Sequence, residues 1–140
     1  MTALLERDEL LAALAAAASA GGRLVFVGGE AGVGKTALVR AFEEQTGLPV
    51  LRGSCESLAT PTPLGPFVDI AAEVGGELAT VLTESPEPRA VARALLAELA
   101  RPVVAVIEDV HWADEATLDA LRVVGRRIDG TRGAVVATYR

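Results

Sequence analysis

The sequence predicts an α/β fold in which a mostly parallel sheet lies among packed helices. Short apolar runs of strand length alternate along the chain with longer segments of helical character. This alternation is typical of parallel sheets, whose strands are joined by helices. A glycine-rich stretch follows the first strand segment and leads into a helix, which marks the place where we expect function.

The first helix is expected over residues 7–20, where Ala and Leu dominate and Leu10, Leu11 and Leu14 share one face. Two glycines follow this segment and end the helix. The apolar stretch is shorter than a membrane span, and the residues before it are mainly acidic, unlike those of a signal peptide. We therefore expect a cytoplasmic protein without a membrane segment.

The remaining elements follow from apolar runs and the residues that interrupt them. Strands are expected over residues 23–28, 50–53, 103–107 and 133–138. Helices are expected over residues 35–46, from 67–72, and over 89–100 and 114–128. Residues 56–66 contain three prolines and predict a loop, whereas 74–88 give no clear prediction. Asp114 is the expected cap of the last helix, with Glu115 in its first turn and Arg126 and Arg127 in its last.

Composition limits the class of protein. The chain has 140 residues, about one domain by length, and 51% of them are apolar. Aromatic residues are few (three Phe, one Trp and one Tyr), so Ala, Val and Leu must build the core. The net charge is −6, and an acidic surface repels phosphate backbones, so we expect no direct contact with nucleic acid. The single Cys55 excludes an intrachain disulfide and predicts a small buried apolar residue.

Residues 29–36 (GEAGVGKT) fit the pattern G-x-x-x-x-G-K-[ST] and stand between a predicted strand and a predicted helix. Glycines let the backbone curl so that several amides point at one anion, and the helix N-terminus adds unpaired donors. Lys35 is the only Lys among 13 basic residues, and its compact charge suits a phosphate. A glycine-rich turn without a ligand is the alternative.

This pattern predicts binding of a nucleoside triphosphate, ATP with Mg²⁺. Lys35 would reach the β- and γ-phosphates, and the Thr36 hydroxyl would help to hold Mg²⁺. The full set of predicted contact positions is Gly29, Glu30, Ala31, Gly32, Val33, Gly34, Lys35, Thr36 and Ala37.

A second motif carries two acids at the end of an apolar run, residues 103–109 (VVAVIED). One acid can ligate Mg²⁺, and the other can orient or deprotonate an attacking water. By position Glu108 is the acid on the metal side and Asp109 is the candidate base. Most enzymes of this kind have Asp at the first place, so the division of roles stays open. Two solvated acids at a strand end are the structural alternative.

Five stretches occur in the order GGEAGVGKT, LRGSCE, PTPLGPFVDI, VIEDVHWADEATLDALR and VVATYR. Together they resemble the AAA-type ATPase domain of large ATP-binding LuxR-type transcriptional regulators, members of the STAND class of signal-transduction ATPases. The resemblance covers nearly the whole chain. It implies a P-loop NTPase three-layer sandwich and a single AAA-type domain over residues 1–140, with ATP and Mg²⁺ as cofactors.

The resemblance also implies roles for single residues. Arg140 falls where the family has a polar sensor near the γ-phosphate, and His111 and Trp112 match a family signature of unclear chemistry. We expect His111 to be a hydrogen-bonded loop residue and Trp112 to pack under the following helix. Arg126 or Arg127 could reach a neighbouring subunit as an arginine finger, which would require self-association. The favourable interaction of basic side chains with the C-terminal end of a helix is enough to explain both arginines.

The family continues past Arg140 with a fifth strand, a helical lid and often a C-terminal DNA-binding region. We therefore expect a fragment truncated at its C-terminal side, with about four strands present. In the family's strand order, 5-1-4-3-2, the missing strand pairs with residues 23–28. This segment would then be an exposed sheet edge and a liability for solubility.

The expected function is a nucleotide-dependent switch that hydrolyses ATP slowly. The main rival is an interaction module that binds nucleotide weakly or not at all. A transport ATPase is disfavoured because no LSGGQ-like signature stands between the two motifs. A small-molecule kinase is disfavoured because no basic lid is evident.

Overall fold

In the computed structural model, residues 2–29, 33–60 and 62–140 are described. Within them one parallel sheet has the strand order β1-β4-β3-β2. Its strands are β1 Arg23–Gly28, β2 Val50–Ser54, β3 Val104–Glu108 and β4 Ala134–Tyr139. The order agrees with the one expected from the resemblance, and the predicted α/β fold is confirmed.

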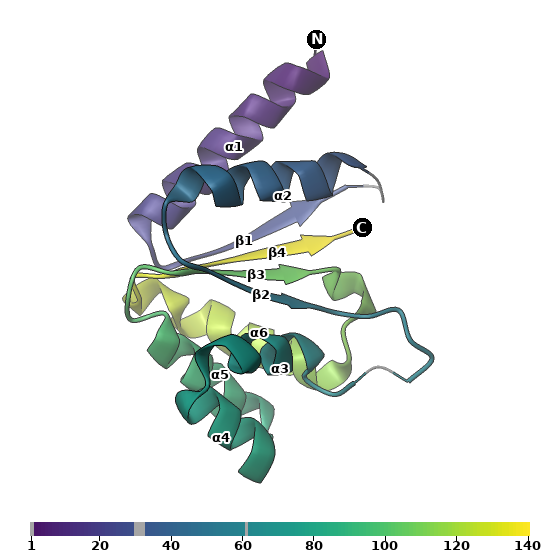
Figure 1. The fold of residues 1–140 in the computed structure, drawn as a ribbon, viewed down its shortest axis with the longest axis vertical. Coiled ribbons are helices and arrows are strands. Elements are labelled where there is room, and N and C mark those ends of the chain that lie inside the picture. The colour runs from purple at the N-terminus through teal and green to yellow at the C-terminus, as the bar shows by residue number, and fades with distance from the viewer. Residues whose placement is uncertain (1, 30–32, 61) are drawn as a thin grey trace.

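Helices cover both faces of the sheet and make a three-layer sandwich (Figure 1). One face carries α1 Thr2–Ala20 and α2 Val33–Thr46. The other face carries α3 Gly65–Val74, α4 Gly76–Glu84, α5 Pro88–Glu98 and α6 Glu115–Arg127. Two short 3₁₀ helices, η1 Val110–Trp112 and η2 Ile128–Gly130, flank α6. No described helix is both long enough and apolar enough to cross a membrane.

The central strand β3 explains why its sequence is an unbroken apolar run. Successive side chains of a strand point to opposite faces of the sheet. Val104 and Val106 therefore pack into the cluster under α1 and α2, whereas Ala105 and Ile107 pack into the cluster under α3 to α6. All four residues are fully buried because β3 lies between β2 and β4 with a helical layer on each side.

The ends of the helices differ from the predicted ones where local signals are weak. The segment that gave no clear prediction contains α4, which is separated from α3 by Gly75 in the left-handed region at φ 60°. Helix α1 begins at Thr2, and α2 begins at Val33, two residues earlier than expected. Of the three leucines expected on one face of α1, Leu14 is buried but Leu10 is not. It is 48% exposed, because the N-terminal part of α1 projects beyond the rest of the domain (Figure 1).

The carboxyl ends of the four strands lie along one edge of the sheet, at the right of Figure 1. The strand register brings Gly28 of β1 beside Tyr139 of β4, and Ser54 of β2 beside Glu108 of β3. Among the described residues, β1 pairs only with β4 and is an edge strand, as expected. On that edge Phe26 is 55% exposed and meets Tyr139 edge to face, with ring centroids 6.3 Å apart.

Candidate functional site

A cavity of about 160 Å³ lies at the carboxyl edge of the sheet, between the start of α2 and the ends of β3 and β4. It brings together side chains from the two motifs that the sequence singles out. The residues that line it are Lys35, Thr36, Arg40, Glu108, Asp109 and Thr138. Two basic groups, hydroxyls and carboxylates thus face one small space, although Thr36 and Glu108 are 72 positions apart in the sequence.

Lys35 reaches across the cavity towards the end of β4. Its Nζ donates a hydrogen bond to the backbone oxygen of Tyr139 at 2.6 Å. The salt bridges found among the described residues do not involve Lys35. Its ammonium group therefore meets a neutral carbonyl, and the positive charge stays available to an anion.

The start of α2 adds backbone donors to this cavity. The first amides of an α-helix have no partner within the helix and carry a partial positive charge. Gly34, Lys35, Thr36 and Ala37 lie in the first turns of α2, so amides of this segment can bind an anion. Gly29 has φ 152°, a conformation that favours glycine. Of the predicted contacts, Glu30, Ala31 and Gly32 lie outside the described residues, as does the side chain of Val33.

The two acids leave β3 in different environments. Glu108 is the last residue of the strand and is half-buried, whereas Asp109 is exposed and left-handed, with φ 62° and ψ 45°. Such a conformation costs about 1–2 kcal/mol for most residues, but Asp tolerates it comparatively well. The Asp109 amide donates to the Thr138 hydroxyl at 3.0 Å, which ties the end of β3 to β4. This turn brings both carboxylates to the edge of the cavity.

His111 holds the chain end of β4. The Arg140 amide donates to His111 Nδ1 at 3.0 Å, so this nitrogen carries no proton, and the prediction of a hydrogen-bonded loop residue is confirmed. The Arg140 side chain is exposed and does not line the cavity. Its role as a sensor of the γ-phosphate stays a prediction.

The prediction that Trp112 packs under the following helix is wrong, because its side chain is 44% exposed. A 3₁₀ helix has about three residues per turn, so Val110 and Ala113 share one face. That face packs against the core, which leaves Trp112 outside. Its ring lies against His111, with centroids 5.2 Å apart.

The comparison with protein families agrees with this geometry. The family model described as AAA ATPase domain matches residues 4–136. The chain belongs to the AAA ATPase domain family. Its matched segment contains the glycine-rich loop, the two acids and Thr36, so family membership indicates nucleotide binding for this part of the chain. A comparison with curated proteins found no match.

The oxygen atoms in the cavity of this AAA ATPase domain suit Mg²⁺. The ion prefers hard oxygen ligands and is usually held by one or two carboxylates together with waters and phosphate oxygens. The Thr36 hydroxyl and the Glu108 and Asp109 carboxylates are groups of this type. Among the described residues, no group of three or more His, Cys, Asp or Glu could hold a metal ion by itself. The side chains therefore fit a metal that arrives with a polyphosphate.

Two lining residues of the AAA ATPase domain escaped the sequence reasoning. Thr138 is 4% exposed, and its signal was a polar residue at the end of an otherwise apolar strand. Arg40 follows Thr36 by four positions on α2, so helical periodicity places both on one face.

Proposed function

We propose that this domain binds Mg-ATP in the cavity between the start of α2 and the ends of β3 and β4. The observation that carries the proposal is the meeting of Lys35, Thr36, Glu108 and Asp109 around one small space. The triphosphate would lie at the first turn of α2, where backbone donors and the Lys35 ammonium both favour negative charge.

In this proposal Lys35 exchanges a neutral partner for a charged one. Hydrogen bonds between an ammonium and an anionic oxygen are roughly twice as strong as neutral ones. We therefore expect the Lys35 Nζ to turn from the Tyr139 carbonyl towards the β- and γ-phosphates when nucleotide binds. Thr36 and Glu108 would supply oxygen ligands to the accompanying Mg²⁺.

Hydrolysis needs a group that orients or deprotonates the attacking water. Glu108 and Asp109 are both candidates, and each lines the cavity. Glu108→Gln and Asp109→Asn separate the roles. The variant that removes the base should lower phosphate release by about 10²-fold or more while ATP still binds. The variant that removes the metal ligand should weaken Mg-dependent binding itself.

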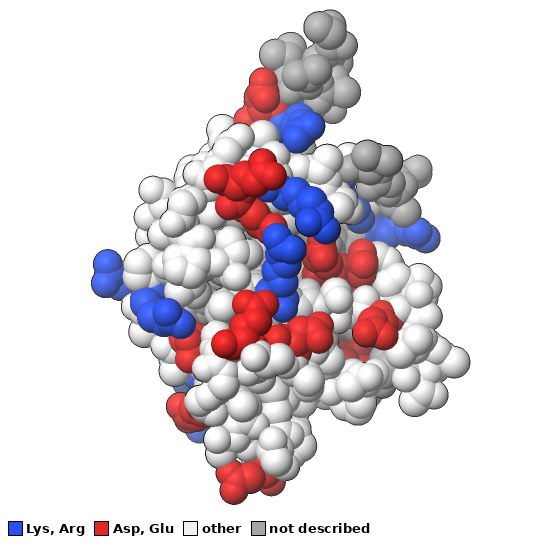
Figure 2. Space-filling view, in the orientation of Figure 1, with Lys and Arg blue, Asp and Glu red and all other residues white. Residues whose placement is uncertain are grey.

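We also propose that the domain acts as a signalling switch in a LuxR-type transcriptional regulator. This rests on the resemblance of the stretches GGEAGVGKT and VIEDVHWADEATLDALR. DNA binding would then belong to a region outside these residues. On the face seen in Figure 2, basic side chains stand beside acidic ones. One ion pair of the chain joins Arg52 to Glu43. With a net charge of −6, we expect no direct DNA contact by this segment.

Titration with Mg-ATP tests the binding proposal. Lys35→Ala should weaken binding by about 10- to 100-fold, because a hydrogen bond to a charged group contributes about 1.5–3 kcal/mol. Arg93→Ala is the matched control. It also removes one positive charge, from an exposed position on α5 in the opposite helical layer, and should leave the affinity unchanged.

Chelation of Mg²⁺ should reduce the affinity of the wild-type protein and have less effect on Thr36→Ala. Equal affinity of the wild type and Lys35→Ala would contradict the proposed site. It would favour an interaction module without nucleotide-dependent switching.

A further inference from the structure

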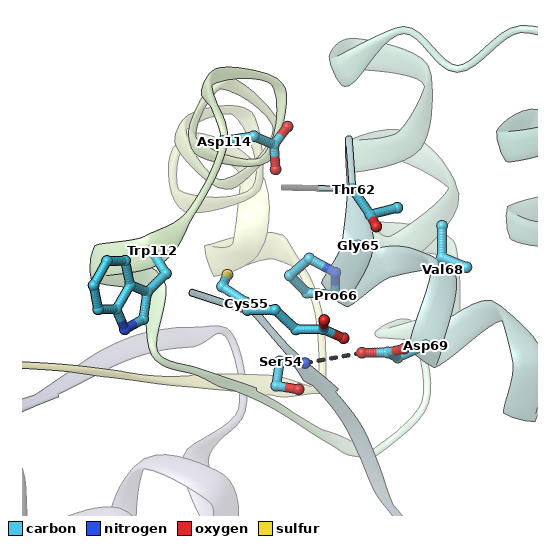
Figure 3. A pocket seen from close by; sticks show the side chains of 10 residues that line it. Ser54, Cys55, Thr62, Gly65, Pro66, Val68, Asp69, Trp112 and Asp114 are labelled. Atoms are coloured by element: carbon cyan, nitrogen blue, oxygen red, sulfur yellow. Dashed lines mark hydrogen bonds between the residues drawn. The ribbon is translucent and has the colours of Figure 1, made fainter. Parts of the chain in front are cut away.

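A second cavity of about 210 Å³ lies at the carboxyl end of β2, which β3 and β4 separate from β1. Its walls come from the chain after β2, from the first turns of α3 and from the segment between β3 and α6 (Figure 3). Among the described residues, it shares no lining residue with the cavity that contains Lys35. It is therefore a separate cavity, and the residues proposed to bind nucleotide do not line it.

Hydrogen bonds from three backbone amides fix the walls of this second cavity. The Ser54 amide donates to Asp69 Oδ2 at 3.0 Å, which joins β2 to α3. The Leu64 amide donates to Asp114 Oδ2 at 3.2 Å, which joins the start of α3 to the start of α6. The Cys55 amide donates to the Glu108 oxygen at 2.9 Å. The cavity is thus largely formed in advance, as expected for a ligand site.

The Cys55 side chain points into this cavity. Figure 3 shows its sulfur directed into the space between Trp112, Pro66 and Asp114. The side chain is 7% exposed, and no hydrogen bond to its Sγ is found among the described residues. A buried thiol without a partner leaves a polarisable surface for a ligand to contact.

The cavity has a strongly negative character. Three carboxylates line it, those of Glu56, Asp69 and Asp114, and its described lining contains no Lys or Arg. Burial, followed by the charges of Asp114, Asp109 and Asp69, raises the pKa of the Cys55 thiol to about 12. The thiol is consequently neutral at physiological pH and does not act as a nucleophile.

The remaining lining residues suit an organic cation better than a metal ion. The acids there do not form a described group of three or more that could hold a metal. Trp112 stands at the cavity with its ring partly exposed, and indole rings attract cations over their faces. An ionised carboxylate has about four acceptor positions, so Asp69 can accept further hydrogen bonds beside the one from Ser54. Pro66 and Val68 add apolar surface for a short carbon chain.

We propose that this second cavity binds a small organic cation, an ammonium or guanidinium group on a short apolar stem. A water molecule takes about 30 Å³ in the liquid, so about 210 Å³ holds a molecule of several heavy atoms. The charged end would meet Asp69 and Asp114, and the stem would lie against Cys55 and Val68.

The test uses the whole chain without nucleotide, so its result is independent of the proposed ATP site. The probe is n-butylammonium chloride, with 1-butanol and sodium butanoate at equal ionic strength as neutral and anionic counterparts. Trp112 is the only Trp and Cys55 the only Cys in the sequence, and both line the cavity. Trp112 emission therefore reports occupancy of the cavity.

Butylammonium should change Trp112 emission with saturation. Butanol should bind at least about fivefold more weakly, and butanoate more weakly still. Asp69→Asn keeps an acceptor for the Ser54 amide but removes a charge, and should weaken butylammonium binding about fivefold or more. Asp119→Asn, an exposed acid of α6 outside the cavity lining, is the matched control and should bind like the wild type.

Val68→Lys gives a second approach, because Val68 is exposed and its replacement by Lys should fold. The new ammonium would occupy the cation position and should abolish butylammonium binding. Equal binding of butylammonium and butanol would overturn the proposal, as would the absence of a saturable response from the folded protein. Unchanged affinity in both Asp69→Asn and Val68→Lys would overturn it as well.

Discussion

Replacement of Asp114 by Ala tests how strongly this side chain joins the start of α6 to the start of α3. Asp114 is the N-cap of α6, and its Oδ2 accepts from the Thr117 amide at 3.2 Å. The same oxygen accepts from the Leu64 amide at 3.2 Å, and Oδ1 accepts from the Thr117 hydroxyl. Leu64 is buried and left-handed at φ 57°, so its position depends on such contacts.

The magnitude follows from the groups that lose a partner in Asp114→Ala. Loss of the N-cap costs about 1 kcal/mol. The part-buried Leu64 amide loses a hydrogen bond to a charged group, which is about 1.5–3 kcal/mol and somewhat less where water replaces it. The Thr117 hydroxyl is fully buried and loses its acceptor as well. We expect a total loss of about 3–4 kcal/mol in the free energy of unfolding, a large share of the 5–15 kcal/mol typical of a domain.

Urea unfolding followed by far-UV circular dichroism measures this loss. Thr117→Val removes only the hydroxyl contact and should cost about 1 kcal/mol. The double variant should cost less than the sum of the two single changes, because both remove the same hydrogen bond. A loss below about 1 kcal/mol in Asp114→Ala would refute the reasoning, since the N-cap alone would then account for everything.

Two further predictions concern glycines of the two outer strands and the Cys55 thiol. Gly53→Ala should destabilise the protein by about 3 kcal/mol or more in urea unfolding, because a Cβ there would lie 2.2 Å from the Pro66 backbone oxygen. A Cβ at Gly28 would lie 2.4 Å from the Tyr139 ring, but that exposed ring can move away, so Gly28→Ala should destabilise the protein less. Equal losses of stability in the two variants would contradict this distinction. Burial raises the pKa of Cys55 from 9.0 to about 12. Because the thiol ionises at a lower pH in the unfolded chain, the stability that the neutral thiol contributes is complete below pH 9 and is lost as the pH rises towards 12. Between pH 9 and 11 the wild type should lose about 2–3 kcal/mol more stability than Cys55→Ala, and parallel losses would contradict the raised pKa.

Sequence patterns were most informative where the controlling interaction is local. The glycine-rich loop, the apolar run of β3 and the Asp114 cap each depend on residues within a few positions of one another. Alternation of strands and helices was enough to predict the fold class. The strand β1 begins and ends where the sequence predicted, since glycines bound it on both sides.

The burial of single side chains was harder to predict from the sequence. Trp112 was expected to be packed and Leu10 to share a face with Leu14, but Trp112 and Leu10 are both exposed. Their hydrophobicity indicated a preference for burial, but the extent of α1 beyond its neighbours and the turn of η1 decided the outcome. Helix α4 escaped prediction because its glycines and flanking prolines weaken every local helical signal.

The sequence by itself determined the fold class, the strand segments and the two motifs that converge on the proposed nucleotide site, because these depend on periodicity and on short-range chemistry. Only the tertiary structure decided that Lys35 meets the Tyr139 carbonyl, 104 positions away, and that Thr138 holds the turn at Asp109. It alone revealed the second cavity, whose walls come from three separate segments. Such contacts arise when the whole sheet and its helices pack together, and no local pattern specifies which distant atoms will then be neighbours.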